Sequence, residues 1–96
     1  MKKCTFYSMT RTSDGPAAVL RDGYDDGTFY YYNNGGLWMA IHPATGCAVA
    51  WSNTRKACAE NAHAPGMAET IAGAVQRAPE AVRSFAEAVK KAKEAA

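Results

Sequence analysis

The sequence predicts an α+β fold, in which a small antiparallel β-sheet of three to five strands is followed by two or three α-helices packed on one face. Residues 1–52 contain short alternating runs separated by Gly, Asn, Asp and Pro, which is typical of strands and turns. Residues 53–96 are rich in alanine and interrupted by proline, which favours helices. Strands followed by helices indicate an antiparallel sheet, and 96 residues indicate a single domain, 1–96.

The first two strands are predicted on either side of a proline turn. Residues 4–11 alternate between polar and apolar side chains until the sequence TSDGP at 12–16 stops the pattern. Residues 17–21 are short enough to be a second strand, and 22–27 are expected to form a loop. Three aspartates in that loop are interpreted as turn residues, because the glutamate and spacing of a calcium loop are missing.

Two hairpins follow. Residues 28–32 and 37–42 flank NNGG, and both a two-residue Asn34-Gly35 loop and a four-residue loop place Tyr32 opposite Leu37. The next turn, PATG at 43–46, is expected to return the chain antiparallel over 47–52, with His42 opposite Cys47.

These registers assign the side chains to two faces of the sheet. One face is predicted to hold most of the large aromatic residues: Phe29, Tyr31, Trp38, Ala40, His42, Cys47, Val49 and Trp51. The other is predicted to hold Tyr30, Tyr32, Leu37, Met39, Ile41, Ala48 and Ala50. Because the alanines of the second face allow a helix to approach closely, we expect the helices to cover that face.

Three helices are expected in the second half. Residues 54–63 form a short helix with an N-capping hydroxyl from the SNT sequence, and Pro65-Gly66 ends it. Residues 67–78 repeat apolar side chains at helical spacing, and Pro79 begins a last helix that extends to about residue 92. The apolar positions that define these last two stripes are Met67, Ile71, Val75, Val82, Phe85, Ala86 and Val89.

Composition argues against several classes of protein. Apolar residues make up 48% of the chain and charged residues 21%, which is typical of a folded domain. A net charge of +2 does not indicate a strongly basic nucleic-acid wrapper. The sequence contains no recognisable secretory signal and no membrane-spanning run, and the cysteines form no Cys-x-x-Cys pair, so we expect a cytoplasmic location with no membrane contact.

Four residues have side chains that zinc prefers: His42, Cys47, Cys58 and His63. The spacing disfavours a shared site without excluding one, because Cys58 and His63 are five residues apart on a helix, about 140° around its axis. His42 could activate the Cys47 thiol, but no acid or amide is placed to orient the imidazole. We therefore predict no metal, no cofactor and no enzymatic activity.

The aromatic face is the candidate binding surface. Residues 29–51 carry no charged side chain, and Phe29, Tyr31, Trp38 and Trp51 would form an exposed aromatic patch if no helix covered their face. The alternative is that the four residues are core. We expect a protein-binding module that docks through this face or adjoining loops, such as an inhibitor, antitoxin-like or anti-CRISPR-like accessory protein of a bacterial or phage mobile element. Self-association into a homodimer through the same face is a further alternative.

A nucleic-acid-binding module is the other function considered. Arg55 and Lys56 begin a helix after a hairpin, with Lys2, Lys3 and Arg11 as further cations. The segment TRKACAENA resembles the strand-to-helix junction of double-stranded-RNA-binding domains, and HPATGCAVAWSNTRKACAENA resembles HicB-type antitoxins. Both resemblances imply a β-to-α junction. Steep salt dependence would distinguish nucleic-acid binding from an aromatic protein interface.

Overall fold

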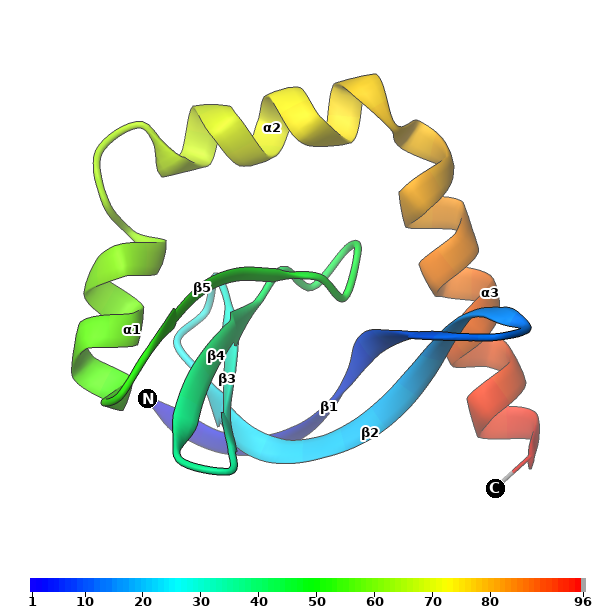
Figure 1. Cartoon of the computed structure of the whole chain (residues 1–96), viewed down its shortest axis with the longest axis horizontal. Helices are drawn as coiled ribbons and strands as arrows, with labels where there is room; N and C mark the ends of the chain where they lie inside the picture. The colour runs from blue at the N-terminus through cyan, green and yellow to red at the C-terminus, as the bar shows by residue number, and fades with distance from the viewer. Residues whose placement is uncertain (96) are drawn as a thin grey trace.

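The computed structural model describes residues 1–95 and contains a five-stranded antiparallel sheet followed by three helices (Figure 1). The predicted α+β class is therefore confirmed. The strands are paired in chain order: β1 (Lys2–Thr12), β2 (Gly15–Asp25), β3 (Tyr30–Asn34), β4 (Leu37–Ile41) and β5 (Ala48–Ser52). The helices are α1 (Arg55–Ala62), α2 (Met67–Arg77) and α3 (Pro79–Ala95). Over residues 1–95, no helix combines the length and apolarity needed to cross a bilayer.

β1 and β2 form a long, curved hairpin. They pair over their whole length, from Lys2 opposite Asp25 to Thr12 opposite Gly15. β2 therefore continues through residues 22–25, which the sequence predicted as a loop, because those residues pair with the beginning of β1. Figure 1 shows the hairpin curving away from β3 and β4 toward α3. This curvature forms an inner face of the sheet, on which Phe6 stacks on Tyr30 with ring centroids 4.7 Å apart.

The β3–β4 hairpin differs from its predicted register by two residues. Its loop is Gly35-Gly36, and Asn34, not Tyr32, lies opposite Leu37. Both glycines have positive φ, 63° and 101°, which the two central positions of a type I′ turn require. Because the offset is an even number, Tyr31, Ala40 and Trp38 still share one face, as predicted.

The β4–β5 pairing contains a β-bulge for which the sequence has no evident signal. His42 N–H donates to Cys47 C=O at 2.9 Å, which confirms that these residues are opposite each other. The register then shifts, so that Ile41 pairs with Ala48 but Ala40 pairs with Ala50. The extra residue in β5 moves Trp51 opposite Met39, onto the face away from Trp38.

The helices cover the face opposite to the predicted one. α1 packs Cys58 and Ala62 into a core with Phe29, Tyr31, Ala40 and Ala50, and Trp38, Val49, Ala59 and Ile71 pack around it. The other face is filled by the curved hairpin, which forms a second core of Phe6, Tyr32 and Ile41 with Cys4, Tyr30 and Met39. The reason for the error is the bulge. It places Ala50 beside Ala40, and this pair of small residues allows α1 to approach the aromatic face.

α2 runs above β5, and α3 then packs beside the turn end of the β1–β2 hairpin (Figure 1). No α2 residue is buried, whereas α3 buries Phe85 and Ala88. The Phe85 ring packs against Gly46, where any side chain would collide with it. Gly46 C=O also accepts a 2.8 Å hydrogen bond from Met9 N–H, so α3, β1 and the β4–β5 loop meet at this point.

Candidate functional site

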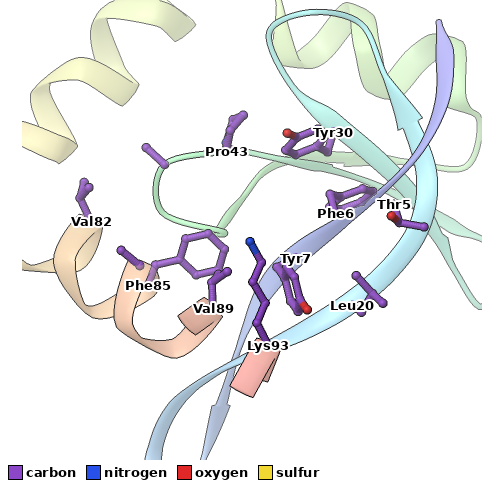
Figure 2. A pocket seen from close by; sticks show the side chains of 12 residues that line it. Thr5, Phe6, Tyr7, Leu20, Tyr30, Pro43, Val82, Phe85, Val89 and Lys93 are labelled. Atoms are coloured by element: carbon purple, nitrogen blue, oxygen red, sulfur yellow. The ribbon is translucent and has the colours of Figure 1, made fainter. Parts of the chain in front are cut away.

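A groove of about 690 Å³ lies between α3 and the outer edge of β1 (Figure 2). Most of its lining is apolar. The helical wall comes from Val82, Phe85, Ala86, Val89 and Lys93, and the sheet wall from Thr5, Phe6, Tyr7, Leu20 and Tyr30. Pro43 and Ala44, in the loop before β5, complete it. Leu20 of the sheet wall remains 57% exposed, so apolar surface extends beyond the rim of the groove.

The β1 strand presents an unpaired backbone edge to this groove. In an antiparallel strand, successive residues direct their N–H and C=O groups to alternate edges. Met9 N–H points away from β2, toward Gly46. The backbone groups of Tyr7 and Thr5, two and four residues earlier, therefore point to the same outer edge. Among the described residues, Met9 is the one β1 residue whose outward N–H has a backbone partner.

One cation lies among the apolar walls. The Lys93 ammonium is 6.0 Å from the centre of the Tyr7 ring, within the range of a weak cation–π contact. Figure 2 shows its side chain extending from α3 into the groove, with the nitrogen at its inner end. The groove thus combines an open strand edge, apolar walls and a positive charge, which together suit an extended apolar segment bearing a carboxylate.

The predicted aromatic patch is divided between the core and the surface. Phe29 is 5% exposed and Tyr31 is fully buried, so these two do not form an exposed patch. Trp38 is half-buried at the margin of the α1 core. Trp51 is 60% exposed, because the bulge in β5 turns it to the other face. The prediction of a single exposed face of four aromatics was therefore wrong, since α1 covers it.

A hydrogen-bonded cluster around Asp26 explains why Tyr31 is buried. The Tyr31 hydroxyl donates to Asp26 Oδ2 at 2.7 Å, and His63 Nε2 lies 2.8 Å from the same oxygen. Asp26 Oδ1 accepts from the backbone N–H groups of Thr28 and Phe29 at 2.9 and 2.8 Å. The cluster joins the β2–β3 loop to the end of α1.

The ionisation of this cluster follows from its contacts. Burial acts to raise the pKa of Asp26, but hydrogen bonds from Phe29, Tyr31, His63 and Thr28 lower it well below the usual carboxyl range. Burial, and then the hydrogen bond to the Asp26 carboxylate, raise the pKa of Tyr31 far above its ordinary value. Asp26 is therefore a carboxylate and Tyr31 a neutral donor, which suits a structural role.

Arg55 is held within the molecule. Its guanidinium lies 4.1 Å from the Tyr24 ring centre and 5.8 Å from that of Trp38, so α1 contacts β2 and β4 through one side chain. Lys56, the other predicted nucleic-acid contact, is exposed beside it. Lys3 and Arg11 are eight residues apart on β1, roughly 26 Å in an extended strand. Lys3 lies opposite Tyr24, whose ring Arg55 covers, so Lys3 and Arg55 are neighbours, whereas Arg11 is far along β1 from both.

The four candidate zinc ligands are divided among three places. His42 and Cys47 are opposite each other before β5, with His42 Nδ1 3.1 Å from Thr45 Oγ1. Cys58 is buried in the core, where burial raises its pKa, and its thiol donates to Ala50 C=O at 3.7 Å. His63 is bound to Asp26. Within residues 1–95, no group of three or more His, Cys, Asp or Glu side chains is placed to hold a metal ion.

Both sides of the groove have a signal in the sequence, but the groove itself has none. The alternation of residues 4–11 gives β1, and the α3 stripe includes Val82, Phe85 and Val89. Their proximity depends on the curvature of the β1–β2 hairpin and the path of α2, neither of which has a signal in one sequence. Comparison of the chain with protein-family models, curated proteins and solved structures found no match.

Proposed function

We propose that the protein is a non-enzymatic protein-binding module that captures an extended segment of its partner as an added strand along β1, in the groove beside α3. The observation that supports this most directly is the outward backbone edge at Thr5 and Tyr7 within an apolar groove. Strand addition supplies main-chain hydrogen bonds for affinity, and pockets for alternate side chains supply specificity.

The β1 edge is favoured over β5, which is the other outer strand. β5 has five residues and contains the bulge, and short, bulged strands are the usual protection of an exposed edge. β1 has eleven residues, and its charged side chains, Lys2, Lys3 and Arg11, are near its ends. Thr5–Tyr7 is thus uncharged and walled by α3, which suits a specific partner strand.

The expected partner segment alternates apolar and polar residues and carries an acidic side chain or a terminal carboxylate. Alternate side chains of an added strand would face Val82 and Val89, where apolar groups are favoured. The carboxylate would pair with Lys93, which has no anionic partner among the described residues. Such a rim pair adds about 0.2–1 kcal/mol and weakens with salt.

Sequestering a partner's segment suits an inhibitor, antitoxin-like or anti-CRISPR-like accessory protein of a bacterial or phage mobile element, acting in the cytoplasm. A segment held as a strand is not free to complete its own protein's fold or active site. The thiols of Cys4, Cys47 and Cys58 are unpaired, as expected in a reducing compartment. Self-association along β1 is the competing use of the same edge.

Selection from a displayed library of random linear peptides, followed by calorimetry on the selected peptide, tests the proposal. Thr5→Pro removes an outward N–H while keeping the β1–β2 hydrogen bonds, so affinity should fall about tenfold or more. Arg11→Pro is the matched control, because its N–H is also outward but lies beyond Met9. Equal losses in both variants, or none in Thr5→Pro, would contradict strand addition at this edge.

A second pair of variants tests the helical wall without altering a strand. Ala86→Glu places an acid in the groove at an exposed α3 position, whereas Ser84→Glu places the same acid on α3 outside it. Only Ala86→Glu should weaken the binding of an acidic peptide, with an affinity about 2–5-fold lower from charge repulsion alone. If Ser84→Glu weakens it equally, binding responds to overall charge and not to the groove.

A further inference from the structure

A second, smaller cleft lies between α2 and β5, on the other side of the β4–β5 loop. Its volume is about 280 Å³, and no charged residue lines it. Small side chains leave it open: Ala74 and Ala78 of the α2 segment, and Ala81 of α3, face Val49 on β5. Ile71 anchors α2 to the α1 core, yet no α2 residue is buried. The α2 stripe therefore stays partly uncovered above the sheet.

His42 is the one histidine in this lining, and its hydrogen bonds define which ring nitrogen is free. Thr45 Oγ1 accepts from Cys47 N–H at 3.4 Å and lies 3.1 Å from His42 Nδ1. With the Thr45 hydroxyl donating to Nδ1, the neutral ring carries its proton on Nε2. That Nε2–H has no partner within residues 1–95. Burial lowers the pKa of His42, which keeps the ring neutral.

We propose that this cleft binds a small, uncharged, mainly apolar molecule that accepts one hydrogen bond from His42 Nε2–H. The volume of the cleft limits the size of the molecule that it can hold. Apolar cavities of about 150 Å³ bind single-ring molecules, so 280 Å³ suits a compound of two fused rings or an equivalent branched chain. A peptide strand or helix is too large for it. This site is separate from the groove beside β1 and does not depend on the function proposed for that groove.

Quinoline and naphthalene are suitable probes, because they have the same two-ring shape and only quinoline has an accepting nitrogen. Calorimetric titration of the full chain at neutral pH should give saturable quinoline binding, with naphthalene about 2–10-fold weaker, as expected for one net hydrogen bond. The methyl signals of Val49 and Val75, which line the cleft from β5 and α2, should shift with quinoline.

Three variants distinguish binding in the cleft from binding elsewhere on the protein. Ala74→Phe fills the cleft from an exposed α2 position and should abolish binding of both probes. Ala72→Phe adds the same ring to an exposed α2 residue outside the cleft and should not. His42→Phe should equalise the two affinities. The proposal is overturned if neither probe saturates, if Ala74→Phe binds like wild type, or if His42→Phe still prefers quinoline.

Discussion

Replacing Asp26 with asparagine should destabilise the fold through loss of its charge-assisted hydrogen bonds. Asparagine keeps the Oδ1 acceptor for Thr28 and Phe29, but its amide cannot accept from both Tyr31 and His63 at the second position. A hydrogen bond to a charged group contributes about 1.5–3 kcal/mol, and the His63 side chain is 46% exposed, so its share is small. We expect a loss of about 3 kcal/mol, or roughly 12–24 °C in Tm for a chain of this size.

The stability that the Asp26 carboxylate contributes should decrease as the pH is lowered. The pKa of Asp26 is lower in the folded state than its ordinary value of 3.8, so the carboxylate stabilises the fold above that pH. The contribution is lost as pH falls from there through the folded-state pKa. Denaturant unfolding from neutral to acidic pH should therefore show wild type and Asp26→Asn converging at low pH. Tyr31→Phe should cost less than Asp26→Asn, and His63→Gln least. A difference below about 0.5 kcal/mol between wild type and Asp26→Asn at neutral pH would refute the reasoning.

Four further substitutions test the packing. Gly46→Ala should cost about 2–4 kcal/mol in denaturant unfolding, because φ is +69° and the new Cβ would collide with Phe85; a neutral result would mean that α3 does not pack there. Trp51→Ala should cost less than about 1 kcal/mol, and Trp38→Ala about 2–3 kcal/mol; equal costs would contradict the bulged register. Arg55→Met should cost about 0.5–2 kcal/mol in thermal unfolding, and no loss would argue against its stacking role.

The order and type of the elements could be predicted because each has a local signal. The N-capping hydroxyl of Thr54 accepts from Ala57 N–H at 3.1 Å, and α2 and α3 begin at Met67 and Pro79, as expected. The faces of β3 and β4 were predicted correctly although the predicted turn was wrong, because an offset of two residues keeps each side chain on the same face. The face assignment failed on β5, where a one-residue bulge reversed the positions of Ala50 and Trp51.

The candidate site could not be predicted because it depends on contacts between distant segments. Asp26 has the local signature of a turn residue, and only the fold brings Tyr31 and His63 to it. Tyr7 and Lys93 are at opposite ends of the chain, and the curvature of a long hairpin joins them. A helix does pack against small residues of the sheet, as expected, but the β-bulge places Ala50 on the aromatic face beside Ala40.

The central claim is that β1 offers a free edge to a partner strand, and residue-resolved amide hydrogen exchange tests it most directly. Without a ligand, the outward amides of Thr5 and Tyr7 should exchange quickly, whereas those of Phe6 and Ser8, bonded to β2, should be protected. Adding a selected peptide should protect Thr5 and Tyr7. Protection of these two amides in the free protein, or protection by the peptide at β5 in place of β1, would contradict the account.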